Sequence, residues 1–378
     1  MDDRCRIAKT VYNMKAGFYV NVAFAGGSLT VAIGASNTAN TTWRRLFMRY
    51  LRDMYLPMYR FQISEIYGAM GGLMSCGLAF TLKRQVISHD PTIVFVEEVW
   101  NDFTSSPDRM LVKKAVEGCI RQIKSSKTTP DCVLLGVGCK PGAGDKPDGT
   151  LDHSLHRELA DYYKIPFVDL QSYVNEQLVV RKQKWENIAF DACHLNDYGQ
   201  QMWYEALRNW FDRQVNIYEV EPAKYETADL PPPLYSDEFQ HVLTVDPSKK
   251  SKAIRLKGSW EKMEDPEVPW YFENVLKGRT GDKLTYRFKG TGIGVFCQTY
   301  NNGLKIEAVL DGKEIAGPFT NYPVEFGTFH MLGHGMKYGE HVLELTVGDK
   351  MKNRNRLEDP TGRIAYLCVA GVKPEQAE

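Results

Sequence analysis

The chain has 378 residues, longer than most single domains, so about two domains are expected. Hydrophobic residues make up 43% and charged residues 25%, which is ordinary for a globular protein. Lysine plus arginine and aspartate plus glutamate number 47 each, so the net charge is zero. This balance argues against a nucleic-acid partner, because proteins that hold a phosphate backbone usually carry a basic excess.

The N-terminus shows no sign of export, because no apolar core with a small-residue cleavage site follows the polar residues 1–6. No stretch approaches the roughly 20 apolar residues that span a bilayer, so no membrane partner is expected. These features predict a cytoplasmic protein whose eight scattered cysteines are reduced. If a natural leader precedes this sequence, the expectation changes to secretion.

The first half of the chain alternates short apolar runs with longer helical patterns. Strands are predicted over residues 20–24, 61–66, 92–96, 132–137 and 167–170. Helices are predicted over residues 42–55, 75–86, 110–123, 154–163 and 197–212. This alternation predicts an α/β domain with a parallel sheet covered on both faces, whose ligands bind beyond the carboxyl ends of the strands.

The second half has a different pattern. Residues 216–236 contain Pro222 and three prolines at 231–233, and they are predicted to link a first domain, residues 1–215, to a second, residues 237–378. Strands bounded by glycines are predicted in the second domain over residues 283–288, 294–299, 305–310, 341–347 and 363–370. The pair Asp311-Gly312 is typical of a tight hairpin turn. The pattern predicts an all-β sandwich.

Ser28 follows the first predicted strand and two glycines, Gly26 and Gly27. Glycines permit a sharp turn and a close approach of substrate. A serine in this place presents its hydroxyl at the carboxyl end of the strand, as a candidate nucleophile whose own N–H faces an oxyanion. The alternative is a serine that only caps a helix.

Three further positions supply partners for such a nucleophile. Asp191 and His194 lie three residues apart, so the carboxylate can orient one ring nitrogen while the other faces Ser28. Gly72 and Asn101 each follow a predicted strand and offer a backbone and a side-chain N–H. The alternatives are an exposed Asp–His pair or a core histidine, a loop glycine, and an ordinary Asn-Asp turn. The sheet edge gathers all of them at one rim.

These segments together resemble the SGNH hydrolases, also called the GDSL esterase/lipase family. The first block of the family appears as Gly26-Gly27-Ser28-Leu29, with Gly27 where an aspartate often stands. Gly72 matches the second block, and Asn101-Asp102 the third, which lacks the usual glycine two residues earlier. The fifth block, Asp-x-x-His-Leu-Asn, is complete over residues 191–196.

The resemblance implies a flavodoxin-like, doubly wound sheet of five parallel strands. It implies that Ser28 is the nucleophile, His194 the general base and acid, and Asp191 its orienting carboxylate. Ser28, Gly72 and Asn101 would then form the oxyanion hole. No cofactor and no metal are expected.

The second domain is similar, less specifically, to the jelly-roll modules joined to carbohydrate esterases. That pairing implies a deacetylase of oligosaccharides. Two alternatives stay open: a general short-chain esterase, lipase or thioesterase, and a non-catalytic carbohydrate-binding protein. The oligomeric state is not predicted.

Other residues have a structural interpretation. His330 and His334 have the spacing of a metal pair but no obvious third ligand. Cys193 stands next to the base and is interpreted as packing. The aromatic residues Trp203, Trp210, Trp260, Trp270 and Tyr271 are expected in cores rather than as sugar platforms.

Overall fold

The computed structural model describes residues 4–106, 108–220, 230–263, 271–320, 322, 325–349 and 360–377. The chain divides into two compact units, Met1–Ser236 and Asp237–Glu378. Among the described helices, none combines the length and apolar character needed to cross a membrane.

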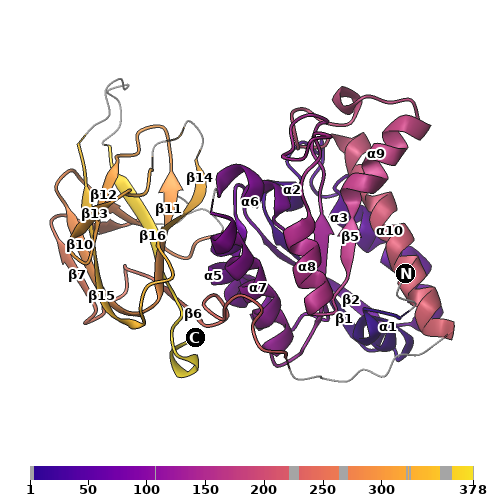
Figure 1. Cartoon of the computed structure of the whole chain (residues 1–378), viewed down its shortest axis with the longest axis horizontal. Coiled ribbons are helices and arrows are strands. Elements are labelled where there is room, and N and C mark those ends of the chain that lie inside the picture. Colours follow the sequence, from indigo (N-terminus) through magenta and orange to yellow (C-terminus); the bar gives the residue numbers. More distant parts are fainter. Residues whose placement is uncertain are drawn as a thin grey trace. The chain divides into compact units, whose positions relative to one another are not determined.

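The first unit is built on the predicted parallel sheet (Figure 1). Its strands are paired in the order β2-β1-β3-β4-β5, the order of flavodoxin-like folds. All five predicted strands are confirmed, as β1 (Tyr19–Gly26), β2 (Gln62–Ala69), β3 (Ile93–Glu97), β4 (Asp131–Gly136) and β5 (Phe167–Asp169). The central strand β3 is buried over its whole length, which explains its continuous apolar run.

Helices cover both faces of this sheet (Figure 1). One face packs against α1 (Ala8–Lys15), α3 (Trp43–Met54), α9 (Leu170–Val180) and α10 (Asp197–Val220). The other packs against α5 (Ser75–Gln85), α7 (Arg109–Ser125) and α8 (Ser154–Tyr162). Three short helices, α2 (Ser28–Val31), α4 (Leu56–Tyr59) and α6 (Val99–Ser105), complete the described α-helices of this unit. The five predicted helices are confirmed, whereas α1 and α9 were not expected.

Helix α3 holds the single turn α2 in place. The indole N–H of Trp43 donates to the Leu29 carbonyl at 3.0 Å. Arg44 Nε donates to the next carbonyl, that of Thr30, at 2.7 Å. Trp43 also packs edge-on against Phe24 of β1, with ring centroids 5.2 Å apart. These buried contacts fix the segment that begins at Ser28.

The predicted linker is partly helical and partly bound to the first unit. Helix α10 continues to Val220, so residues 216–220 are not linker, and residues 221–229 lie outside the described part of the chain. Further on, the backbone N–H groups of Tyr235 and Ser236 both donate to Glu117 of α7 at 2.8 Å. The end of the proline-rich segment, residues 235–236, hereafter the strap, therefore lies against α7, because the buried Glu117 carboxylate accepts hydrogen bonds from its backbone N–H groups.

The second unit is a two-sheet β-sandwich, as predicted. One antiparallel sheet has the order β13-β12-β15-β10-β7, and the other β14-β11-β16-β9-β8, with β6 paired to β16. A common core, from Leu284 to Val372, takes side chains from both sheets. The strands are β6 (Val242–Val245), β7 (Ile254–Lys257), β8 (Glu261–Lys262), β9 (Leu276–Gly278), β10 (Lys283–Gly290), β11 (Gly292–Thr299), β12 (Ile306–Leu310), β13 (Lys313–Ile315), β14 (Phe326–Gly333), β15 (Gly339–Val347) and β16 (Gly362–Ala370).

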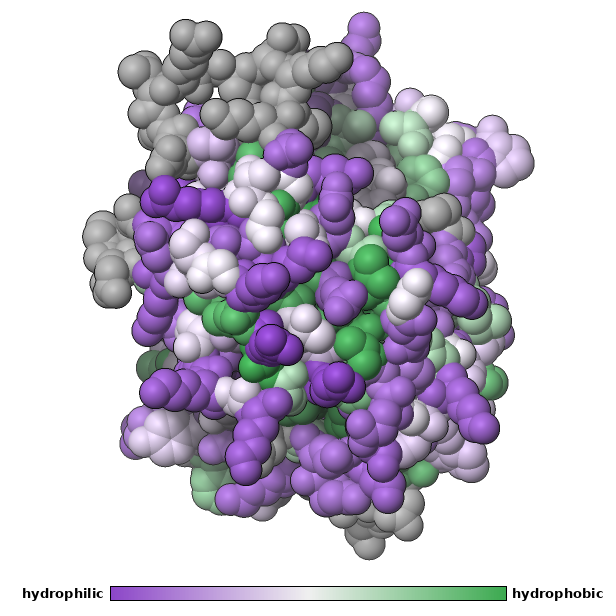
Figure 2. Space-filling model, turned by 90° about the vertical axis from the view of Figure 1, so that its left-hand side faces the viewer, coloured by the Kyte–Doolittle hydropathy of each residue, from purple (hydrophilic) through white to green (hydrophobic). Residues whose placement is uncertain are grey.

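Strand β10 shows how alternating side chains direct one face of its sheet to the core and the other to solvent. Leu284, Tyr286 and Phe288 are buried, while the alternating Arg287 and Lys289 are exposed. Figure 2, which shows the side where β7 and β10 lie in Figure 1, has a mainly hydrophilic surface with hydrophobic residues between.

The predicted hairpin turn is confirmed between β12 and β13. Asp311 and Gly312 have φ values of 51° and 79°, the positive values of a two-residue type I′ turn. Leu310 and Lys313 pair directly across it.

Candidate active site

The predicted site residues meet at the carboxyl edge of the parallel sheet. Ser28 starts α2 directly after β1, and Gly72 lies in the loop after β2 with a φ of 71°. Asn101 lies in the first turn of α6, after β3. Asp191 and His194 belong to a loop over residues 188–196, hereafter the Asp–His loop, which leads into α10.

A chain of hydrogen bonds joins three of these side chains. His194 Nδ1 lies 2.7 Å from Asp191 Oδ2, so its N–H donates to the carboxylate. The opposite ring nitrogen, Nε2, lies 2.8 Å from Ser28 Oγ and can accept its proton. Ser28 is 7% exposed, whereas the Asp191 side chain is 53% exposed. The arrangement couples a nearly buried hydroxyl to a carboxylate at the protein surface.

Asp191 stays ionised in spite of its partial burial. Burial raises the pKa of its carboxyl, but the backbone N–H groups of His194 and Cys193 and the imidazole lower that pKa to about 2. Both N–H groups donate to Asp191 Oδ1, at 2.7 and 2.8 Å. The ionised carboxylate selects the tautomer with the proton on Nδ1, which leaves Nε2 free to act as a base.

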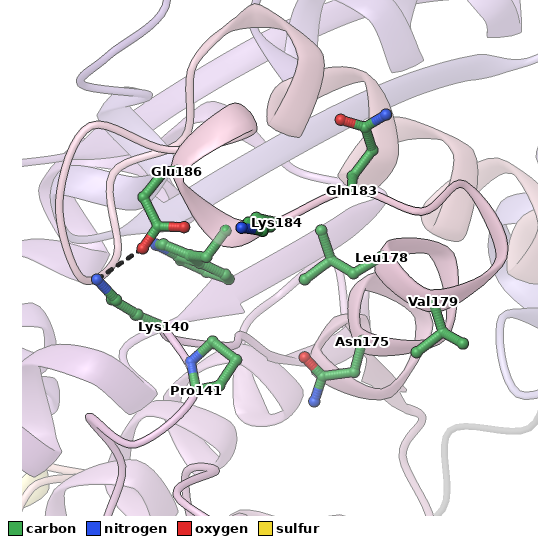
Figure 3. Close-up of a pocket in the computed structure, with 9 residues that line it drawn as sticks. Lys140, Pro141, Asn175, Leu178, Val179, Gln183, Lys184 and Glu186 are labelled. Atoms are coloured by element: carbon green, nitrogen blue, oxygen red, sulfur yellow. Dashed lines mark ion pairs between the residues drawn. The ribbon is translucent and has the colours of Figure 1, made fainter.

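Neighbouring segments fix the Asp–His loop from outside. Trp185 Nε1 donates to the Asp191 carbonyl at 2.6 Å, and the Lys140 backbone N–H donates to the Ala192 carbonyl at 2.8 Å. The same two residues line a cavity of about 490 Å³ beside α9. Figure 3 shows Leu178 and Val179 on one side of this cavity and the Lys140–Glu186 ion pair on the other. Ser28 is not among the residues that line this cavity.

Gly27 leaves the space that the Asn101 amide occupies. A Cβ at residue 27 would stand 1.8 Å from Asn101 Nδ2, far inside van der Waals contact. Asn101 Nδ2 also donates to the Leu73 carbonyl at 2.8 Å, beside Gly72. An amide group has two N–H donors, and the contact with Leu73 uses one of them. The sequence shows only that an aspartate is missing at residue 27, and not what fills its place.

Asp102 joins helix α6, which carries Asn101, to the end of the loop that contains Gly72. Its Oδ1 accepts from both the backbone N–H and the hydroxyl of Ser75, each at 2.9 Å. Ser75 is the first residue of α5, directly after the loop that contains Gly72. The sequence did not predict this contact, although Asp102 belongs to the third of the matched blocks.

Two further carboxyl groups are buried at the end of β3. Glu97 accepts from the Thr30 hydroxyl at 3.0 Å. Within the described residues, neither carboxyl oxygen of Glu98 has a hydrogen-bond partner. Burial raises the pKa of Glu97 to about 8 and raises the pKa of Glu98 well above its ordinary value of 4.5, with nearby carboxyl charges adding to the second shift. At neutral pH both carboxyl groups therefore keep a proton in the folded protein that they would release in the unfolded chain.

We expect Glu98→Gln to stabilise the protein at alkaline pH. The folded state binds the Glu98 proton more tightly than the unfolded chain, so stability falls as pH rises above about 4.5, the unfolded pKa. A neutral amide removes that loss. The melting temperature at pH 8 should rise by about 2–4 °C for each kcal/mol recovered, with a smaller change at pH 5.

Glu117→Gln is the matched control, because Glu117 is also a fully buried glutamate. Its oxygens accept from backbone N–H groups of the strap, which an amide nitrogen cannot replace. Calorimetry should show a lower melting temperature for this variant at both pH values. A Glu98→Gln variant that is equally destabilised would contradict the assignment of a costly buried carboxyl.

The remaining candidates have structural surroundings. His330 lies on β14, 3.2 Å from the Thr328 hydroxyl, and within the described residues the His330/His334 pair gains no third metal ligand. Trp203 is 2% exposed and Trp210 packs against the same core. Trp260 packs against the second core and Tyr271 against Phe272, whereas Trp270 lies outside the described residues. All eight cysteines are buried, and none of them forms a disulfide.

Comparison with known proteins places part of the first unit in a family. A profile of the GDSL-like lipase/acylhydrolase family matches residues 24–202. No curated protein matches the sequence. The structure of a two-domain esterase active on acetylated mannans has a TM-score of 0.81 and 19% identity, over 98% of this chain and 96% of that chain.

The structure of such an esterase co-crystallised with mannopentaose gives a TM-score of 0.79 and 18% identity, over 97% of this chain and 95% of that chain. At these identities the likeness shows a shared two-domain fold. The family profile covers the strand ends that carry Ser28, Gly72 and Asn101 and the whole Asp–His loop. Residues 24–202 therefore form a domain of the GDSL-like lipase/acylhydrolase, or SGNH hydrolase, family.

Proposed function

We propose that this protein is a serine esterase that removes acetyl groups from carbohydrates through an acyl-enzyme intermediate. The observation that carries the proposal is the hydrogen-bonded chain Ser28–His194–Asp191, with contacts of 2.8 and 2.7 Å. Ser28 serves as nucleophile, His194 as general base and acid, and Asp191 as the group that orients the imidazole.

In the first half-reaction, His194 Nε2 takes the Ser28 proton while Ser28 Oγ attacks the acyl carbon. Negative charge develops on the acyl oxygen, where the N–H groups of Ser28, Gly72 and Asn101 stabilise it. His194 then gives its proton to the sugar hydroxyl that leaves. Water enters, loses a proton to His194, and cleaves the acyl–Ser28 bond to release acetate.

The substrate class rests on two supports. The first is the second unit, since the esterase active on acetylated mannans shares both the catalytic fold and the sandwich along nearly the whole chain. The second is the neutral overall charge, which suits an uncharged polysaccharide better than an anionic polymer. The sandwich would then help to hold the saccharide chain.

The direct test is acetate release from acetylated manno- and xylo-oligosaccharides, compared with hydrolysis of aryl acetate and aryl octanoate. We expect acetate release from at least one saccharide, and kcat/KM for the aryl acetate at least about tenfold above that for the octanoate, the factor produced by ~1.4 kcal/mol. A preference for octanoate would favour a lipase. Saccharide binding without turnover of any ester would favour a non-catalytic binding protein.

A further inference from the structure

The Asp–His loop brings together three side chains with metal-binding atoms, Asp191, Cys193 and His194, and the proposed esterase chemistry leaves the Cys193 thiol unused. Cys193 Sγ lies 3.6 Å from His194 Nδ1, on the side of the ring away from Ser28. Asp191 Oδ2 lies 2.7 Å from the same nitrogen. Among the described residues, this is the one group of three histidine, cysteine or acidic side chains whose ligand atoms lie within 4.8 Å of one another.

The distances suit a small tetrahedral ion. Zinc bonds of about 2.3 Å to sulfur and about 2.0 Å to nitrogen separate the two ligand atoms by roughly 3.6 Å at the tetrahedral angle. That is the separation found between Cys193 Sγ and His194 Nδ1, which is 3.6 Å. The Asp191 oxygen must retreat from Nδ1 by about 0.7 Å to reach its own position. The Asp191 side chain is 53% exposed, and the displacement of Oδ2 must lengthen or turn the two contacts from backbone N–H groups to Oδ1.

We propose that Asp191, Cys193 and His194 form an inhibitory site for a borderline-soft divalent cation, Zn²⁺, on the Nδ1 side of the imidazole. The mixed donor set of sulfur, nitrogen and carboxylate oxygen matches the ligands that this ion prefers. A water molecule would complete the tetrahedron. Metal binding rests on the geometry alone, whereas inhibition rests on the proposed esterase function.

The ion inhibits because it prevents His194 from acting as the general base. A metal bond to Nδ1 displaces the proton from that nitrogen, and the neutral ring then carries its proton on Nε2. In this tautomer Nε2 cannot accept the Ser28 proton. The Cys193 thiol releases one proton to solvent as its thiolate binds. Burial raises the pKa of this thiol, so binding must be strong enough to displace a tightly held proton.

Calorimetric titration of the full chain with ZnCl₂ tests binding without any need for turnover. We expect one ion per chain, and an affinity at least about tenfold weaker in Cys193→Ala and Cys193→Ser, since each loses a thiolate ligand. Cys193→Ser nearly preserves the side-chain volume, in case the alanine variant unfolds. The matched control is Cys5→Ala, another buried cysteine of the same core, which should bind like the wild type.

Kinetics add a second readout. Zn²⁺ should lower kcat for an aryl acetate with KM unchanged, because the ion occupies the far side of the ring from Ser28, and a chelator should restore the rate. Equal Zn²⁺ affinity in wild type and both Cys193 variants would overturn the proposal, as would the absence of saturable binding. A chain that binds one Zn²⁺ through Cys193 but hydrolyses no ester would support this site and contradict the proposed function.

Discussion

Ser28→Ala is expected to abolish hydrolysis of an aryl acetate, with kcat falling on the order of 10⁶-fold, the scale measured when a serine hydrolase loses its nucleophile. The reason is geometric, since Ser28 Oγ is the atom that His194 Nε2 contacts at 2.8 Å. The variant should fold normally. It loses one hydrogen bond of about 0.5–1.5 kcal/mol, while the His194–Asp191 contact remains.

Ser88→Ala is a suitable control for that experiment. Ser88 is exposed, follows α5, and its hydroxyl donates to the Arg84 carbonyl rather than to any site residue. Its activity should match the wild type, and labelling by a serine-directed phosphonate should be retained. Residual turnover by Ser28→Ala above about 1% of wild type, or phosphonate labelling of this variant, would remove Ser28 from the role of nucleophile.

The fold was accessible from the sequence because its strongest signals are local. Strands β1, β3 and β4 are mainly apolar runs that end at glycine or glutamate, and β3 is buried along its whole length. Helix α9 was not predicted, and it begins at Leu170, which the predicted strand over residues 167–170 included. Strand β14 was missed because Gly327, His330 and Gly333 interrupt its apolar pattern.

The sequence was enough to name the candidate site residues, but not the contacts that hold them in position. Ser28, Gly72, Asn101, Asp191 and His194 follow strands or precede a helix in a recognisable order. The contacts that position them join residues far apart in the chain, such as Thr30 with Glu97 and Ser75 with Asp102. Pairings of this kind depend on which helix packs beside which strand end, and no local pattern records them.

The second large effect is expected at Asn101 and at Gly27, which lies beside the Asn101 amide. Asn101→Ala should lower kcat about 10²–10³-fold, the scale for one oxyanion-hole donor. Gly27→Ala should cause a similar loss, because its methyl group would stand 1.8 Å from Asn101 Nδ2 and must displace the amide. The φ of residue 27 is −90°, so alanine meets no backbone strain there.

A double-mutant cycle separates this account from a general disturbance of the turn. In the Asn101→Ala background there is no amide left to displace, so adding Gly27→Ala should cost less than about threefold more. Gly71→Ala is the matched control on the same rim, since a Cβ there meets nothing closer than Ile33 Cδ1 at 4.0 Å, and its kcat should stay within a few-fold of wild type. Losses that multiply in the double variant would show that Gly27 acts on Ser28 and not through Asn101. A strongly non-additive cycle would mean that residue 27 must be glycine because the Asn101 amide occupies the space beside it.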